Sequence, residues 1–239
     1  MKKTTALFLA TIMFTPSVFA AELIPYVGVG LVADKAGTSA KRVKFDQTKL
    51  PNIEAAFIPN AGSDMNFDMA FAGEITAGIK YGNIRGELEV AVRSASEDDY
   101  TLYDGQLMGT IPTEIETSTS VRHNSYMANL YYDFTLSDSK WTPYVGAGIG
   151  FGTYRQKATV EVDVPDAFVG TVASLGFPVG EMTVADDTLT EFEWQVGFGA
   201  AYNFTEDWAL DIGYRFNSAN VADEFVYAHE FKLGARYSF

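Results

Sequence analysis

The sequence predicts an all-β fold, an eight-stranded antiparallel up-and-down transmembrane β-barrel, and three observations lead to it. First, eight segments alternate apolar residues with polar or small ones at period two, as strands with two different faces do. Second, long polar connections alternate along the chain with short ones that carry turn residues. Third, the last segment alternates up to Phe239, as expected of a closing strand that pairs with the first.

The N-terminal residues have the pattern of a secretory signal peptide. Two lysines follow the first methionine, a mostly apolar stretch covers residues 6–14, and small residues flank the bond between Ala20 and Ala21. The apolar stretch is too short to span a bilayer, which disfavours an N-terminal anchor. We therefore predict a cleaved signal peptide over residues 1–20 and one outer-membrane β-barrel domain over residues 21–239.

Composition narrows the class of protein further. The 239 residues include no cysteine, so neither a disulfide nor the lipidated cysteine of a lipoprotein is expected. The formal net charge of −14 makes nucleic acid an unsuitable partner, since its phosphates need neutralising by Lys and Arg. Beyond the signal peptide, no long uncharged apolar run predicts a membrane-spanning helix.

The first four predicted strands cover residues 23–33, 67–81, 85–93 and 125–134. In the first, aliphatic residues alternate with Tyr and Gly. In the second and third they alternate with Asp, Glu, Lys and Arg, and in the fourth apolar residues alternate with Ser, Asn and Asp. Each of these segments therefore has one apolar face and one polar or small face.

The last four predicted strands cover residues 143–153, 192–204, 208–217 and 231–239. The fifth carries Gly at nearly every second position, which makes room inside a narrow barrel. The others alternate apolar residues with Gly, Gln, Asp, Arg, Lys and Ser. Most of the eight segments are long enough to cross a membrane with the usual tilt, which takes about nine to eleven residues.

The connections predict the orientation of the barrel. Short turns and both chain ends should lie on the periplasmic side, and four long polar loops should face outward. Val160, Val162 and Val164 alternate with acidic residues inside the third long loop, which leaves open a strand extension or an extra hairpin that would make ten strands. The long connections are residues 34–66, 94–124, 154–191 and 218–226, and the short ones are residues 82–84, 135–142 and 205–207.

Charged residues on the inward phase form the candidate site inside the barrel. An eight-stranded barrel is just wide enough for side chains to fill, so these charges must pair. We interpret them as a structural network of ion pairs, with a gated pore for ions or small solutes as the alternative. The predicted lumenal charges are Glu74, Lys80, Arg85, Glu87, Glu89, Arg93, Asp133, Asp211, Arg215, Lys232 and Arg236.

No catalytic, cofactor or metal site is predicted. The only histidines, His123 and His229, fall on strands at opposite sides of the barrel, and no His–Ser–acid set can be assembled from them. The acidic loops lack the spacing of a calcium loop, and the glycine runs keep period two instead of opening a helix. We therefore expect no enzyme activity and no cofactor.

Three segments resemble the small outer-membrane β-barrel superfamily, which includes opacity proteins, the surface-antigen family and the barrel domain of outer membrane protein A. Residues 142–152 read Thr-Pro-Tyr-Val-Gly-Ala-Gly-Ile-Gly-Phe-Gly, residues 129–134 read Asn-Leu-Tyr-Tyr-Asp-Phe, and residues 233–239 read Leu-Gly-Ala-Arg-Tyr-Ser-Phe. The resemblance implies an outer-membrane location in a Gram-negative cell. It also implies that the barrel-assembly machinery recognises the terminal strand, with Tyr237 and Phe239 as the assembly signal.

The function that follows is a surface role. We expect a structural, adhesin-like or antigenic outer-membrane protein whose long loops meet host or environmental ligands, with membrane lipid as its other partner. The narrow gated pore is the alternative, and an outer-membrane hydrolase or acyltransferase is a distant third.

Overall fold

The computed structural model describes residues 23–45, 57–58, 62–107, 109–174, 176–221 and 224–239. The predicted signal peptide, residues 1–20 with its cleavage residues Ala20 and Ala21, lies outside these ranges and stays a prediction.

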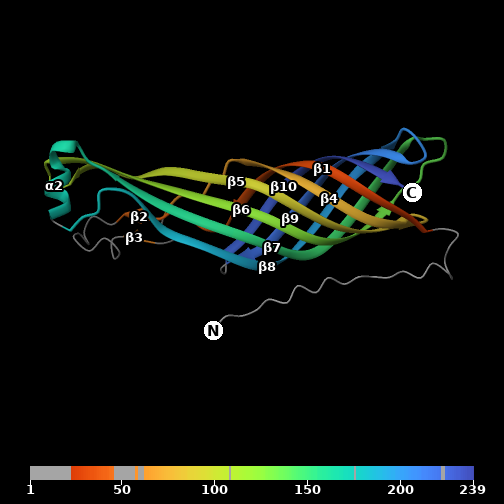
Figure 1. Cartoon of the computed structure of the whole chain (residues 1–239), viewed down its shortest axis with the longest axis horizontal. Coiled ribbons are helices and arrows are strands. Elements are labelled where there is room, and N and C mark those ends of the chain that lie inside the picture. Colours follow the sequence, from red (N-terminus) through yellow and green to blue (C-terminus); the bar gives the residue numbers. More distant parts are fainter. Residues whose placement is uncertain (1–22, 46–56, 59–61, 108, 175, 222–223) are drawn as a thin grey trace.

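Eight antiparallel strands form one closed ring, which confirms the predicted fold class (Figure 1). Strand β1 pairs with β10 on one side and with β4 on the other, so the last long strand closes the barrel against the first. The ten-strand alternative is wrong, because residues 160–163 continue β7 instead of forming an extra hairpin, and the ring has eight strands. Among the described residues, the two short strands β2 and β3 pair with each other outside the ring. The barrel strands are β1 (Leu23–Thr38), β4 (Met69–Tyr81), β5 (Ile84–Leu107), β6 (Ile111–Asp133), β7 (Trp141–Asp163), β8 (Gly180–Asn203), β9 (Trp208–Val221) and β10 (Glu224–Ser238), with β2 (Lys44–Phe45), β3 (Phe57–Ile58) and helix α2 (Asp166–Ser174) outside the ring.

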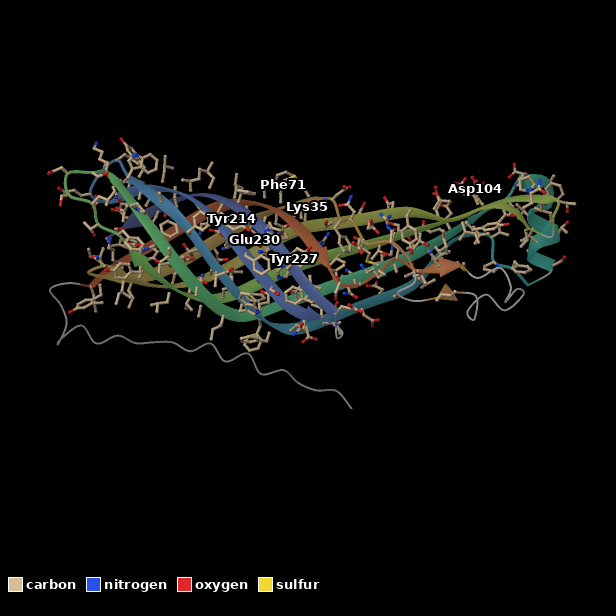
Figure 2. The ribbon with its side chains drawn as sticks, turned by 180° about the vertical axis from the view of Figure 1, so that it is seen from behind. Lys35, Phe71, Asp104, Tyr214, Tyr227 and Glu230 are labelled. Atoms are coloured by element: carbon tan, nitrogen blue, oxygen red, sulfur yellow. The ribbon has the colours of Figure 1, made fainter. Side chains whose placement is uncertain are left out.

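The outward phase of the strands carries an exposed apolar belt around the barrel. Phe71 projects from the wall and is 64% exposed, whereas Glu230 lies inside the ring and is fully buried (Figure 2). A continuous exposed apolar surface of this extent marks a membrane contact. We call it the apolar belt; its members include Val29, Leu31, Phe71, Ile75, Leu88, Val92, Tyr126, Leu130, Ile149, Phe151, Phe192, Phe198, Ile212, Phe231 and Leu233.

Among the described helices, none has the length and apolar character needed to cross a bilayer.

The barrel interior is polar, and the glycines of β7 make room for it. A Cβ on Gly146 would lie 2.2 Å from the Tyr131 ring, and one on Gly152 would lie 2.1 Å from the Glu193 carboxylate. Real Cβ contacts are never this close, so larger residues at these positions would push the facing side chains away. The period-two glycines of residues 143–153 thus serve packing in the lumen, as the sequence predicts.

Four strands continue far beyond the barrel. Strand β4 pairs with β5 only as far as Arg93, and β9 pairs with β8 only as far as Glu193. Past these positions β5, β6, β7 and β8 pair only with one another and run on toward α2 (Figure 1). We call this part the outer sheet; it comprises residues 94–107, 111–124, 153–163 and 180–192.

The prediction of long loops is wrong where the outer sheet forms. The long loops predicted over residues 94–124 and 154–191 are mostly strand, and the one predicted over residues 218–226 narrows to the gap between Val221 and Glu224. Ser, Thr, Asp and Glu dominate the strands of the outer sheet, so the apolar alternation that identifies the other strands is missing there. Where aliphatic alternation exists, the strand extension is confirmed as far as Asp163.

A small apolar cluster holds α2 against the tip of the outer sheet. Val172 of α2 is fully buried among Ile111, Val164 and Phe177. The cluster gives the far end of the sheet its own core, so the tip is a folded structure with a packed interior.

Candidate functional site in the lumen and at its outer mouth

Arg215 of β9 lies at the centre of the charged interior. Its guanidinium is 2.7 Å from Glu89 Oε1 of β5 and 3.2 Å from Glu74 Oε2 of β4, and it also contacts Glu230 of β10. These carboxylates come from three strands of the ring, so the ion pairs run across the lumen. Lys232 reaches the same Glu74 from β10.

A second group of charges lies nearer the short turns. Arg85 Nε is 2.9 Å from Asp133 Oδ1, and Lys80 Nζ is 3.1 Å from the other oxygen of the same carboxylate. Arg236 and Asp211 are 3.7 Å apart across β10 and β9. Every one of the eleven predicted lumenal charges therefore takes part in an ion pair.

Neutral polar side chains complete the hydrogen bonding of these carboxylates. The Tyr26 hydroxyl donates to Glu87 at 2.9 Å, and Asn129 Nδ2 donates to Glu89 at 3.1 Å. Gln195 in turn donates to Asn129 at 2.6 Å. Such partners matter because a buried carboxylate with an unused lone pair is costly.

Three buried acids at the outer end of the barrel are absent from the predicted set of lumenal charges. Asp34, Glu193 and Glu230 are at most 4% exposed, and each lies at or just beyond the outer end of a predicted strand. Asp34 and Glu230 each lie one residue outside the predicted ranges 23–33 and 231–239. Continuing the inward phase of those strands by one residue places both acids inside the barrel, since phase does not change where a strand continues.

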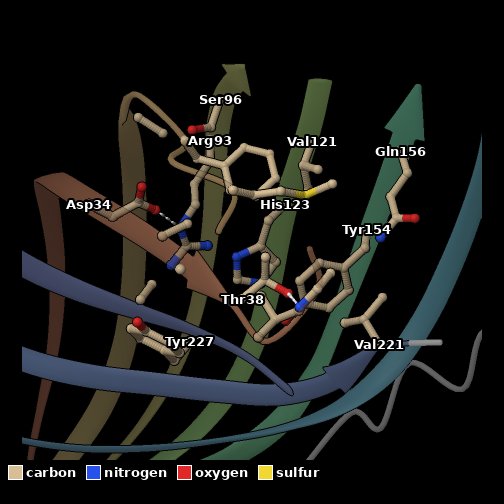
Figure 3. A pocket seen from close by; sticks show the side chains of 18 of the residues that line it. Asp34, Thr38, Arg93, Ser96, Val121, His123, Tyr154, Gln156, Val221 and Tyr227 are labelled. Carbon is tan, nitrogen blue, oxygen red and sulfur yellow. Dashed lines mark hydrogen bonds and ion pairs between the residues drawn. The ribbon is translucent and has the colours of Figure 1, made fainter. Parts of the chain in front are cut away.

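A cavity of about 190 Å³ opens above these acids at the outer mouth of the barrel (Figure 3). Arg93 lies at its floor and donates to Asp34 and to Ser125 at 2.9 Å each, and it also contacts Glu230. The walls are mostly aliphatic and aromatic, and they include Ala36, Met65, Phe67, Ala70, Val121, Tyr154, Val221, Val226, Tyr227 and Ala228.

His123 lines the cavity and reaches a buried acid below it. Its ring stacks on Tyr154 with centroids 4.5 Å apart and planes at 2°, and both side chains contact Glu193. Ser125, on the same strand, is bound instead by Arg93. The other histidine, His229, lies on the exterior, where its Nδ1 is 2.6 Å from the Tyr214 hydroxyl.

The predicted assembly residues lie at the opposite end of the barrel. Tyr237 faces Val27 across β1, and its ring packs 5.0 Å from Trp208 and 5.1 Å from Phe239. Phe239 is 70% exposed and is held through its backbone, which donates to the carbonyl of Pro25 at 2.9 Å.

The outward face of the outer sheet carries carboxylates in cross-strand register. Glu116, Glu161 and Glu181 are direct partners on β6, β7 and β8, and all three are exposed. Glu114 lies opposite Asp163 on one side and Asp104 on the other, near the tip (Figure 2). We call these six residues the acidic rows: Asp104, Glu114, Glu116, Glu161, Asp163 and Glu181.

One ion pair fastens the segment after β1 to the outer sheet. Arg42 Nη2 is 2.6 Å from Asp98 Oδ1, and the amide of Asn66 donates to the same oxygen at 3.0 Å. Burial by itself raises the pKa of Asp98, but the hydrogen bonds from Arg42 and Asn66 outweigh it, and the pKa lies below its ordinary value.

Comparisons with known proteins show which family the chain matches. Residues 6–239 match the family described as outer membrane protein beta-barrel domain. Outer membrane protein PagN of Salmonella typhimurium is 26% identical over 235 residues, which cover 87% of this chain and 89% of PagN.

Two solved structures are also similar. Neisserial surface protein A aligns with a TM-score of 0.47 at 18% identity, over 90% of this chain and 97% of its own. Ail, the attachment invasion locus protein of Yersinia pestis in complex with the heparin analogue sucrose octasulfate, aligns with a TM-score of 0.43 at 11% identity, over 91% and 99% of the two chains.

Proposed function

The chain belongs to the outer membrane protein β-barrel domain family, and from this premise we propose that it is an adhesin-like surface protein that recognises its partner with the outer sheet. It is a β-barrel protein of the outer membrane, and its apolar belt lies in the membrane lipid. The observation that carries the proposal is the continuation of β5, β6, β7 and β8 well past that belt.

The size of the outer sheet exceeds what the barrel needs. From Val92, the last residue of β5 in the apolar belt, to Leu107 the strand runs for about 50 Å at roughly 3.3 Å per residue. Ordering a residue costs about 1–2 kcal/mol of conformational free energy, so short turns would connect the strands at lower cost. A long, ordered sheet with its own apolar tip cluster supports a recognition role outside the membrane.

The charges of the outer sheet indicate the chemistry of the partner. Like charges directly opposite each other on neighbouring strands destabilise a sheet, and Glu116, Glu161 and Glu181 occupy such positions on three strands. A basic partner would relieve this repulsion on binding. We therefore infer that the ligand presents clustered Lys or Arg side chains, as a basic segment of a host surface protein would.

Cell adhesion tests the proposal. Gram-negative cells displaying the E116Q/E161Q/E181Q variant should bind a surface coated with a basic polypeptide about tenfold less than cells displaying the native chain. Adhesion of the native chain should fall as salt rises, because the attraction is electrostatic.

A matched control removes three acidic side chains from the opposite end of the barrel. The D138N/E206Q/D207N variant changes the net charge by the same amount at exposed positions in the short turns. It should adhere like the native chain. Equal adhesion of the outer-sheet variant, or a preference of the native chain for heparin over the basic surface, would contradict the proposal.

The two alternatives have less support. Ion pairs from several strands meet at Arg215 inside the lumen, where a pore would need a path. For a hydrolase or acyltransferase, the hydroxyl of Ser125 would need a base, and its hydrogen bond comes from Arg93. We therefore propose a non-catalytic role, with antigenic display as a consequence of the exposed outer sheet.

A further inference from the structure

The cavity at the outer mouth has the size of a small-molecule site. Its volume of about 190 Å³ exceeds the roughly 150 Å³ of an engineered apolar cavity that binds benzene. The ion pairs of Arg93 close it below, so a molecule inside would enter and leave on the outer side. There is room for one aromatic ring with a short substituent.

The walls favour an apolar body. Phe67 and Ala228 line the cavity, together with Val121, Tyr154 and Tyr227 (Figure 3). Burying apolar ligand surface against such walls yields about 25 cal/mol per Å². Aromatic side chains in the lining suit an aromatic ligand.

The charged groups of the lining already have partners, which favours a neutral ligand. Arg93 pairs with Asp34, His123 contacts Glu193, and Glu224 accepts a hydrogen bond from Ser39. A charged ligand would have to lose its hydration between apolar walls, and the described lining offers an anion no unpaired cation, since Arg93 already pairs with Asp34 and Glu230. A neutral molecule avoids that cost.

One polar group in the lining has no partner. Asn217 is 2% exposed, and among the described residues its Nδ2 finds no acceptor. A buried amide donor without an acceptor costs about 1–3 kcal/mol, so a small rotation of the Asn217 side chain that brings Nδ2 to an acceptor oxygen of a ligand in the cavity would be favourable.

We propose that the mouth cavity binds one small, neutral, mostly apolar molecule, aromatic in its best form, whose single hydroxyl or carbonyl oxygen accepts a hydrogen bond from Asn217. The site is independent of the adhesin-like role, because it lies inside the mouth of the barrel and not on the outward face of the outer sheet.

Methyl NMR of the native barrel in lipid nanodiscs tests this proposal with benzyl alcohol as the probe. The valine methyls of Val121, Val221 and Val226 line the cavity, whereas those of Val29 and Val196 face outward and report partitioning into lipid. Benzyl alcohol should shift the cavity methyls saturably. Ethylbenzene, which has the same shape without the oxygen, should need about three- to tenfold higher concentration, the value of one hydrogen bond.

Charged analogues and variants complete the test. Benzoate and benzylammonium should bind at least about tenfold more weakly than benzyl alcohol, since each must be desolvated. Ala228→Leu, which fills the cavity, should abolish the saturable shifts, and Ala235→Leu, on the outward phase of the same strand, should leave them unchanged.

Asn217→Leu keeps the proposal testable if Ala228→Leu does not fold. It should remove the preference for benzyl alcohol over ethylbenzene. Cavity methyls that shift only in parallel with the lipid-facing ones, equal binding of charged and neutral probes, or an unchanged preference in Asn217→Leu would each overturn the proposal.

Discussion

The charged side chains inside this barrel are neutralised by partners from strands that are distant in the sequence. Arg215 is the clearest case, since three carboxylates on three other strands surround one guanidinium. A buried ion pair contributes little net stability, but removing one partner leaves the others uncompensated. The stability of the lumen therefore depends on complete sets of charges.

Replacing Arg215 by methionine should lower the free energy of unfolding by about 3–5 kcal/mol, because Glu74, Glu89 and Glu230 would remain buried without it. Urea unfolding of the refolded barrel measures the change. The control Arg155→Met breaks an exposed ion pair with Asp186 and should leave the unfolding midpoint where it is. Equal midpoints for the two variants would contradict the argument.

The Asp98 contact should depend on pH. Its folded pKa lies below the ordinary value, so the contact adds stability above an unfolded pKa of about 3.9 and loses it as the pH falls through the folded pKa. The Asn66 amide donates a hydrogen bond to Asp98. Hydrogen exchange at this amide should therefore become faster below about pH 4 than at neighbouring amides, after correction for intrinsic rates. Asp98→Asn should show the faster exchange already at neutral pH. Protection of Asn66 that stays constant down to pH 2 would exclude this role.

At the scale of elements, the last strand, β10, closes the barrel by pairing with the first strand, β1. It pairs with β1 from Thr38 to Tyr26, and its last residues lie at the end with the short turns, where Tyr237 packs on Trp208. The Phe239 side chain is mostly exposed and is fixed by its backbone, so its ring contributes little to the stability of the folded barrel. That separation makes a role in assembly testable.

Phe239→Ala should reduce the amount of folded barrel in outer membranes several-fold while leaving refolding in detergent unchanged. Heat-modifiable gel mobility measures the folded fraction in both settings. Phe204→Ala, an exposed aromatic residue beside another short turn, is the matched control and should assemble normally. Equal loss in membranes and in detergent would show that Phe239 acts on stability instead of assembly.

The strands of the outer sheet could be predicted from the sequence only in part. At residues 160–164 the valines alternate with acids, and the strand extension could be foreseen. In β5 beyond Arg93, polar residues occupy both faces, so no hydrophobic period exists to read. Helix α2 was not foreseen either, because a nine-residue helix is marginal by itself and this one is held by the packing of Val172 at the tip of the sheet.

At the scale of the whole molecule, the barrel is polar inside and apolar outside. The closure of eight strands leaves a lumen that side chains fill, and the ion pairs of Arg215 and Arg93 span it. Solutes that pass through would have to separate these pairs, which costs several kcal/mol in a medium of low polarity.

The native barrel should therefore be silent in planar lipid bilayers at neutral pH. Single-channel recording after insertion of heat-modifiable protein is the measurement, and a known porin inserted into the same bilayer is the positive control. Steady, stepwise conductance of the native chain would favour the gated pore over the surface role.

The sequence by itself determined the strand phases and the inward position of the predicted charges, whereas the choice between eight and ten strands came from the structure. These properties are local, because alternation along a strand decides which side each residue faces. Only the tertiary structure decided that Lys232 meets Glu74 and that Arg215 is shared by Glu74, Glu89 and Glu230. Pairing partners depend on register and closure between strands far apart in the chain, and so do the mouth cavity and the outer sheet, which no alternation within one segment encodes.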